Sequence, residues 1–248
     1  MFEPVGKRKL LSKMVESQIE DAIRSKEVLP GEKLSSEQEL CKQFKVSRTA
    51  LREALRMLAA RGLVIIMKGK GIYVQNISAE TVTDPIYLYL QMQSESNYIL
   101  DVIHARQIIE PPIAALAALN HTEEDAERLK KDLNDLKTTN GDYEELSRLD
   151  MLFHLDIAKA SENLLVPLLL EPIHRLAPRI KSSVYATVID AKKLAVEWHE
   201  KILTGILNRD AENARLAMVR HLEIAEQHDK QILIKQKHKN SIRRAVLK

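Results

Sequence analysis

The stretch between residues 36 and 61 constrains the fold of this chain most, because it contains two helix-start signals only 11 residues apart. Ser36, with Glu39 three residues later, has the form of a capping box and predicts a short helix. Ser47 is placed to cap the next helix, which runs to Arg61. An amphipathic helical segment over residues 10–24 precedes both. Three helices with a tight turn between the second and the third are the plan of a helix-turn-helix.

Two β-rich runs come directly after the third predicted helix. They are residues 63–66 and 72–74, and the segment 67–71 between them contains two glycines and two lysines. The pattern predicts a β-hairpin with a basic tip. A hairpin after three helices extends the prediction to a winged helix-turn-helix, a fold that lays its recognition helix in the major groove of DNA.

The first turn of the third predicted helix carries side chains that suit DNA. Arg48 and Arg52 are one turn apart and share a face, as a helix in a major groove requires. A bidentate arginine–guanine pair contributes about 1–3 kcal/mol of discrimination between bases. Ser47 and Thr49 flank Arg48, and the unpaired N–H groups of this turn favour phosphate. The alternative is a small helical interaction module with a solvated basic face.

Charge is distributed unevenly along the chain, although the formal net charge is only +3. Residues 1–76 have 15 Lys and Arg against 9 Asp and Glu, a net charge of +6. Residues 77–229 have 16 against 26, a net of −10, and residues 230–248 have 7 basic residues and no acidic one. All 8 histidines lie at or beyond His104. A basic first part and an acidic, histidine-containing second part predict two functions, one of them binding a polyanion.

Helices are expected in the second part as well, because 7 Gly, 8 Pro and 4% aromatic residues in 248 are few for a barrel or sandwich. The single cysteine, Cys41, fits a reducing, cytoplasmic location. No apolar run approaches the roughly 18–20 residues that cross a bilayer, so no membrane partner is expected. The pattern predicts helices over 85–93, 98–120, 122–138, 142–163, 164–187, 190–208 and 211–232. We expect a mainly α protein with a winged helix-turn-helix (1–76), a linker (77–80), a bundle of six or seven helices (81–232) and a basic tail (233–248).

Four residues of the second part have the spacing of a metal site. Asp150 and His154 are four residues apart, so they project from one face of one helix. His199 and His221 lie on the two arms of a predicted helical hairpin, each 11 residues from Asp210 at its turn. Antiparallel packing therefore brings the two histidines to the same height. One carboxylate and three imidazoles suit Zn²⁺, Ni²⁺, Mn²⁺ or Fe²⁺, with zinc as the first candidate; a surface or capping pair is the alternative for the first two residues.

The motifs of the first part resemble the GntR family of bacterial transcription regulators. The resembling segments are, in order, Pro30–Leu34, Ser36-Glu37, Glu39-Leu40, Val46–Thr49, Leu51–Leu55, Gly62–Val64 and Gly69-x-Gly71. The resemblance implies that Arg48, Thr49 and Arg52 read operator DNA. It also implies that Lys68 and Gly69 of the wing reach the minor groove.

Two positions depart from the common pattern of that family. Gln38 stands where many members have an arginine that contacts DNA, and Ser35 stands where proline is usual. Gln38 is therefore a candidate DNA contact, and the operator sequence or the affinity is expected to differ from the commonest type. The resemblance also implies a homodimer that places two recognition helices about one DNA turn apart on an inverted repeat.

The second part resembles the effector domain of the FadR subgroup, which is of the FCD type. The resembling segments are Arg106-x-x-Ile109-Glu110, Asp150-x-x-Phe153-His154, Ala160-Ser161-x-Asn163, Trp198-His199 and Met218-x-x-His221-Leu222. The residues that this resemblance implies as ligands of a divalent ion are Asp150, His154, His199 and His221. By the same resemblance Arg106 meets the carboxylate of a small organic acid, unless it forms an internal salt bridge, and Asn163 contacts that ligand or caps a helix.

Together these features predict a ligand-responsive bacterial repressor that leaves its operator when the acid binds beside the metal. Two alternatives stay open. One is a metal-dependent hydrolase with a DNA-binding head, because such a metal site can activate water; no further acid–base pair stands at a fixed spacing near the ligands, so we do not expect an enzyme. The other is a regulator for which the metal itself is the signal.

Overall fold

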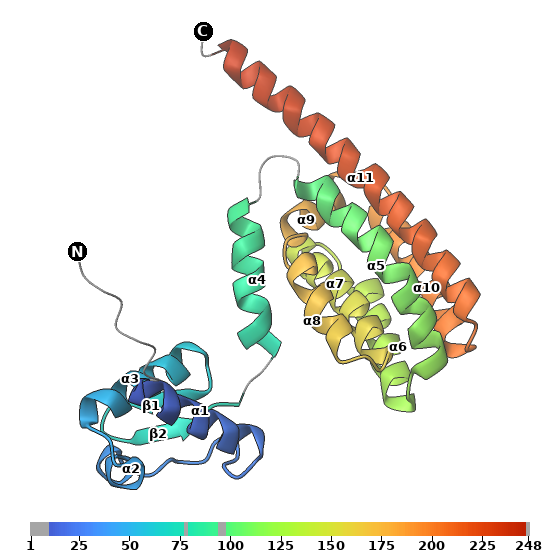
Figure 1. Ribbon diagram of the computed structural model, residues 1–248. Helices are drawn as coiled ribbons and strands as arrows, with labels where there is room; N and C mark the ends of the chain where they lie inside the picture. Colours follow the sequence, from blue (N-terminus) through green and yellow to red (C-terminus); the bar gives the residue numbers. More distant parts are fainter. Residues whose placement is uncertain (1–9, 77–78, 94–97, 247–248) are drawn as a thin grey trace, which may run out of the picture. The chain divides into compact units, whose positions relative to one another are not determined.

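The computed structural model describes residues 10–76, 79–93 and 98–246. Within these residues the chain consists of helices and one two-stranded sheet, which confirms the mainly α class (Figure 1). The chain divides into two compact units, residues 1–81 and 82–248, and each is described by itself. In the described ranges, no helix combines the length and the apolar character that a membrane span requires.

The first unit is a winged helix-turn-helix. Its elements are α1 (Leu11–Arg24), α2 (Glu37–Phe44), α3 (Arg48–Ala60) and the antiparallel strands β1 (Val64–Met67) and β2 (Gly71–Val74). Ser36 and Glu39 form the predicted capping box, and the Ser47 hydroxyl accepts a hydrogen bond from the Ala50 N–H at 3.2 Å. Lys45 ends α2 in the left-handed conformation, with a φ of 53°, and so turns the chain sharply into α3.

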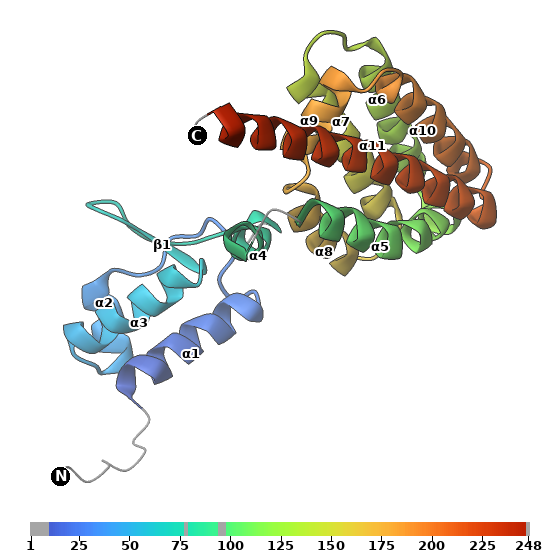
Figure 2. The ribbon, with the colours of Figure 1, turned by 90° about the horizontal axis from the view of Figure 1, so that it is seen from above.

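One face of α3 is fixed by the core of the first unit. Leu51, Leu55 and Leu58 are fully buried and belong to the same apolar cluster as Val15 and Ile19 of α1. Figure 2 shows the hairpin extending away from the helices of this unit. The opposite face of α3 is left open to solvent, because the core uses only one face of the helix.

The second unit is a bundle of helices. They are α4 (Ala79–Gln93), which contains the boundary between the units, α5 (Tyr98–Asn120), α6 (Glu123–Thr138), α7 (Tyr143–Ala160), α8 (Leu165–His174), α9 (Pro178–Thr187), α10 (Ala191–Leu207) and α11 (Ala211–Val246). The long helices α5 and α11 lie side by side, and α10 packs against α11 (Figure 1). Phe153 of α7, Ile202 of α10 and Leu222 of α11 are fully buried in their shared core.

Residues 164–187 fold as two helices, whereas their apolar pattern predicts one. Helix α8 ends at His174, and Pro178 begins α9. A proline has no N–H to donate to the preceding turn, so it is tolerated in the first turn of a helix but interrupts a helix that would run through it. The described part of the second unit therefore has eight helices, more than the six or seven expected.

Two predicted segments are also placed differently. Helix α4 begins at Ala79 and includes Pro85, so residues 79–80 of the expected linker are helical, while residues 77–78 lie outside the described residues. Helix α11 continues to Val246, so the expected basic tail is helical as far as it is described. Its last two residues, 247–248, lie outside the described part of the chain.

Candidate metal centre and nucleic-acid interface

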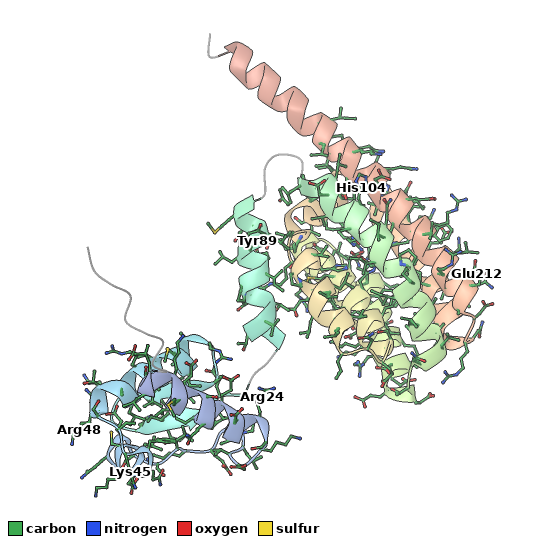
Figure 3. All side chains as sticks on the ribbon, in the orientation of Figure 1. Arg24, Lys45, Arg48, Tyr89, His104 and Glu212 are labelled. Atoms are coloured by element: carbon green, nitrogen blue, oxygen red, sulfur yellow. The ribbon has the colours of Figure 1, made fainter. Side chains whose placement is uncertain are left out.

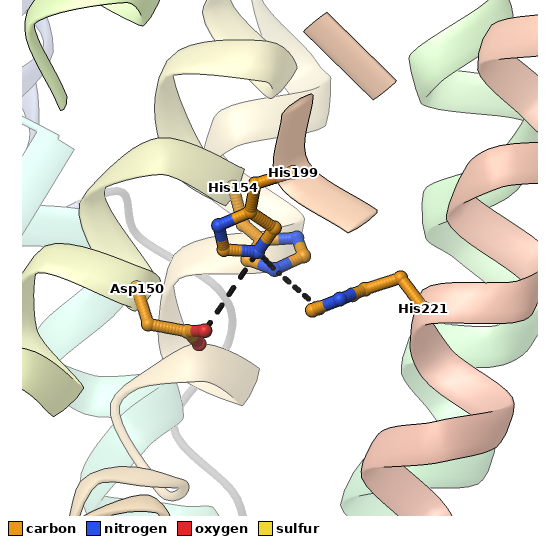
Figure 4. A group of neighbouring side chains, drawn as sticks. All are labelled: Asp150, His154, His199 and His221. Carbon is orange, nitrogen blue, oxygen red and sulfur yellow. Dashed lines mark hydrogen bonds and ion pairs between the residues drawn. The ribbon is translucent and has the colours of Figure 1, made fainter. Parts of the chain in front are cut away.

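Four side chains converge in the interior of the second unit (Figure 4). Asp150 and His154 project from α7, His199 from α10 and His221 from α11. None of the four residues is more than 3% exposed, and one ligand atom from each lies within 4.8 Å of the others. The structure thus brings together the four residues that the sequence spacing grouped, which we call the Asp–His cluster. The α10–α11 hairpin places its two histidines beside each other, as their equal distances from the turn predict.

The three imidazoles of the Asp–His cluster direct their Nε2 atoms at one another. The Nε2 atom of His154 lies 3.1 Å from that of His221 and 3.3 Å from that of His199. His199 Nε2 is 3.7 Å from Asp150 Oδ1. The cluster therefore presents three ring nitrogens and one carboxylate oxygen to a common point.

Glu110 of α5 fixes the ring of His154. Its Oε2 atom lies 2.5 Å from His154 Nδ1, which favours the tautomer with the proton on Nδ1 and the Nε2 lone pair toward the cluster. Its Oε1 atom accepts a hydrogen bond from Arg106 Nε at 2.5 Å and lies 3.0 Å from His174 Nε2. Burial opposes ionisation, but Arg106 and the two histidines outweigh it and hold the pKa of the Glu110 carboxyl well below its usual range.

Asp150 is oriented by α9. Lys181 Nζ lies 2.9 Å from its Oδ2 atom, and the Tyr185 hydroxyl donates a hydrogen bond to its Oδ1 atom at 2.8 Å. Burial raises the pKa of this carboxyl, but Lys181 and the three histidines of the cluster together outweigh burial and hold the pKa well below the usual range. The carboxylate is therefore ionised and held in one orientation by two groups from a single helix.

These residues fit a divalent cation. Three nitrogen lone pairs that face one another repel unless a proton or a cation lies between them. Burial lowers the pKa of both His199 and His221 well below the usual range, so each imidazole is neutral and keeps a lone pair for a metal ion. A metal ion satisfies the same lone pairs, and three imidazoles with one carboxylate are a donor set of zinc and its neighbours.

The sequence analysis assigned no supporting role to four residues around the cluster, although Glu110 is part of one of the resembling segments. Glu110 lies on α5, His174 on α8, and Lys181 and Tyr185 on α9. Apart from Arg106, which shares α5 with Glu110, the partners of these residues are on other helices. Glu110 follows Arg106 by four residues, a spacing that signals an ion pair on one helix face. Nothing in the sequence connects α9 with α7. Glu110, His154 and His174 are also close enough to share an ion, but Glu110 already accepts a hydrogen bond from Arg106.

Of the two predicted ligand contacts, the structure brings Arg106 to the cluster and leaves Asn163 on the surface. Arg106 is 2% exposed, and its Nη2 atom lies 3.2 Å from His154 Nε2 while its Nε pairs with Glu110. The internal salt bridge is thus present, and another edge of the same guanidinium faces the cluster. Asn163 is exposed beside α8, where its Oδ1 atom accepts a hydrogen bond from the Leu165 N–H at 3.0 Å. This is the helix-capping alternative for Asn163.

The predicted DNA contacts all lie on the surface of the first unit. The exposed residues are Ser47, Arg48, Thr49 and Arg52 around the start of α3, Gln38 of α2, and Lys68 and Gly69 at the hairpin tip. Figure 3 shows Arg48 and Lys45 at the outer side of this unit. Arg52 Nε donates to Glu37 Oε2 at 2.9 Å, with its side chain 60% exposed. An exposed pair of this kind contributes about 0–1 kcal/mol, so Arg52 can exchange it for a phosphate or a base.

Known proteins resemble the chain in both units. Residues 11–74 match the family described as bacterial regulatory proteins, gntR family, and residues 101–224 match the FCD domain. HTH-type transcriptional regulator LutR of Bacillus subtilis (strain 168) is 33% identical over 208 residues, 82% of this chain and 94% of LutR. HTH-type transcriptional repressor NanR of Cronobacter sakazakii (strain ATCC BAA-894) is 31% identical over 220 residues, 87% of this chain and 84% of NanR. A solved structure, Streptococcus agalactiae GntR, matches with a TM-score of 0.69 and 26% identity, over 87% of this chain and 99% of that one.

Proposed function

Because the chain belongs to the GntR family of bacterial transcription regulators and contains an FCD domain, we propose that it is a repressor that leaves its operator when a small organic acid binds beside a divalent metal. The family assignment confirms the resemblance of the sequence motifs. The relatives are transcription regulators and not enzymes, so the hydrolase alternative is set aside. Within the family we assign the chain to the FadR subgroup, and its action on an operator places it in the cytoplasm.

The observation that carries the proposal is the buried Arg106 guanidinium beside the Asp–His cluster. The cluster residues would hold the ion, with zinc as the first candidate and nickel, manganese or iron as alternatives. An ion there would supply positive charge, and an ion that takes more than four ligands would also offer coordination positions to an anion. Arg106 offers a planar fork of donors, which suits a carboxylate. A buried site with these two features selects a small acid.

Glu110 would connect the two binding events. One of its oxygens holds Arg106, and the other holds the ring of His154. An acid that pairs with Arg106 would compete with Glu110 for the N–H groups of the guanidinium. Because Glu110 contacts both Arg106 and His154, the binding of the acid would affect α5 and α7 together. A coupling of only about 1–3 kcal/mol between effector and operator is enough to switch occupancy substantially.

In DNA recognition, α3 would enter the major groove. Arg48, Thr49 and Arg52 would contact base edges, and the N–H groups after Ser47 would contact phosphate. Gln38 of α2 would lie at the backbone or a base edge, and the hairpin tip with Lys68 and Gly69 would reach the minor groove. A homodimer would place two such units on an inverted repeat.

The test is operator affinity, measured by fluorescence anisotropy on the full-length protein in three states. We expect tight binding by the metal-loaded protein and weaker binding after addition of a small-carboxylate mixture. Removal of the metal with a chelator should abolish the response to the acid and leave operator binding itself in place. If the chelator alone releases the operator and no acid has an effect, the metal-sensing regulator is the correct description. If acid strengthens operator binding, the protein is not a repressor of the proposed kind.

A further inference from the structure

The wing of the first unit includes a third chain segment, residues 31–34, which lies between α1 and α2 in the sequence. The Leu34 N–H donates a hydrogen bond to the Ile72 carbonyl at 2.8 Å. Lys33 forms an antiparallel bridge with Tyr73 of β2. Strand β1 pairs with the other edge of β2, so β2 lies between two neighbours. Lys33 therefore belongs to the wing, although it precedes both strands in the sequence.

Lys33 lies on the solvent face of the wing. Tyr73 is opposite Lys33 on one side and opposite Ile65 on the other, and residues that stand opposite one another share a face. Ile72 and Val74 alternate with Tyr73, are 3% and 2% exposed, and point to the core of the unit. Ile65 is 41% exposed and Lys33 is exposed. We call the face that carries Lys33, Ile65 and Tyr73 the outer face of the wing.

The side chain of Lys33 runs along this face to the tip of the hairpin. A Cβ atom at Gly71 would lie 2.6 Å from Lys33 Cε and 3.4 Å from its Nζ, so the lysine stem occupies the space that a side chain there would need. Gly71 has a φ of 120°, which favours glycine. Lys33 Nζ also lies 5.8 Å from the centre of the Tyr73 ring. The Tyr73 hydroxyl donates a hydrogen bond to the Lys70 carbonyl at 3.3 Å, which connects this ring to the tip.

Three lysines of the wing have no anionic partner in the described part of the chain. Lys33, Lys68 and Lys70 are exposed, and none of them forms an ion pair with a described residue. By contrast, Arg52 and Arg61 of the same unit each pair with a glutamate. A contact with the face of an aromatic ring uses none of the N–H donors of an ammonium group, so those of Lys33 remain available. Unpaired cations of one sign on a surface attract a polyanion.

We propose, on the basis of the DNA binding proposed above, that Lys33 belongs to the DNA-binding surface and that its ammonium group binds a phosphate of the duplex. The contact lies beside the groove that the hairpin tip enters. Phosphate contacts fix the position of a protein on DNA and do not read its sequence. Lys33 therefore holds the wing on the backbone, and Gly71 and Tyr73 are positioning residues that direct the lysine stem to the tip.

The test measures the affinity of the full-length protein for a mixed-sequence DNA duplex by fluorescence anisotropy over a series of salt concentrations. Each phosphate contact contributes about 0.9 to the slope of log affinity against log salt. Lys33→Met keeps a stem of similar length and removes the charge, so it should reduce the slope by about one per bound chain. Lys33→Arg keeps the charge and should keep the slope. The control Lys193→Met makes the same change in net charge on an exposed lysine of α10 and should leave the slope unchanged.

The outcomes separate this inference from the function on which it rests. If Lys33→Met keeps the wild-type slope, or if Lys193→Met reduces the slope equally, the phosphate contact is wrong and the proposed function stands. A lower unfolding temperature of Lys33→Met with an unchanged slope would give Lys33 a purely structural role and also overturn the inference. If the wild type does not bind the duplex, or binds it without any dependence on salt, DNA binding itself is wrong and this inference falls with it. Should Lys33→Met fail to fold, Lys33→Gln also removes the charge; the same reduction of the slope is expected, and an unchanged slope overturns the inference.

Discussion

Substitution of Glu110 by glutamine should weaken metal binding although Glu110 is not one of the proposed ligands. In the native structure its Oε2 atom lies 2.5 Å from His154 Nδ1, so an ionised carboxylate there favours the tautomer with the proton on Nδ1. A glutamine amide also has a donor side, and when that side faces the imidazole, Nδ1 becomes the acceptor and the proton moves to Nε2. The nitrogen that faces the cluster then no longer offers a lone pair. Loss of such a supporting group typically costs about 10- to 100-fold in metal affinity.

The same substitution should also destabilise the fold, because it removes the counterion of Arg106. The pair is 2.5 Å long and both side chains are 2% exposed. Breaking a buried ion pair by removing one partner costs about 3–5 kcal/mol. Chemical denaturation of the metal-free protein measures this second effect separately from the first.

The assay for the first effect is a competition for zinc between the folded protein and a chelator of known affinity. The matched control is Glu226→Gln, because Glu226 also pairs with a histidine, His104 at 3.3 Å, but on an exposed surface. We expect the control to bind zinc like the wild type. Equal zinc affinity of Glu110→Gln and wild type, in samples that are folded by circular dichroism, would refute the role of Glu110 in setting the tautomer of His154.

Three further predictions concern the DNA interface and the bundle. Arg48→Ala should cost about 1–3 kcal/mol of operator affinity in anisotropy titrations, whereas Arg61→Ala, on a side chain bound to α1 glutamates, should cost little; equal losses would contradict α3 as the reading helix. Lys68→Ala should reduce the slope of log affinity against log salt by about one, and an unchanged slope would remove the wing from the contact. Burial and the nearby Asp156 raise the pKa of Asp132 to about 7. The folded state therefore keeps a proton that the unfolded state releases near pH 4. The free energy of unfolding should fall as pH rises from about 4 to 7. Asp132→Asn should therefore raise the unfolding temperature more at pH 8 than at pH 5. An effect that does not depend on pH would show that Asp132 holds no such proton in the folded state.

Local signals in the sequence predicted the start of most helices. The capping box of Ser36 and Glu39 and the cap at Ser47 depend on residues three apart, and both are present in the structure. The pairing of His199 with His221 was also predictable, because an antiparallel helical hairpin with a short turn fixes which residues lie side by side.

Features that depend on tertiary packing were not predictable in the same way. Lys181 and Tyr185 hold Asp150 in place, and both lie on α9. No local spacing in the sequence indicates that α9 packs against α7. Arg106 could be read as an effector contact or as a salt bridge, and in the structure it faces both the cluster and Glu110.

The most direct test of the metal centre is the metal content of the purified protein, measured by mass spectrometry on wild type and two histidine variants. We predict about one divalent ion per chain in the wild type, and none in His199→Ala, which removes a fully buried ring of the cluster. His104→Ala is the control, because the side chain of His104 is 52% exposed and pairs only with Glu226 among the described residues. It should retain the metal. A folded His199→Ala that still binds one equivalent of metal with wild-type affinity would contradict the proposed centre.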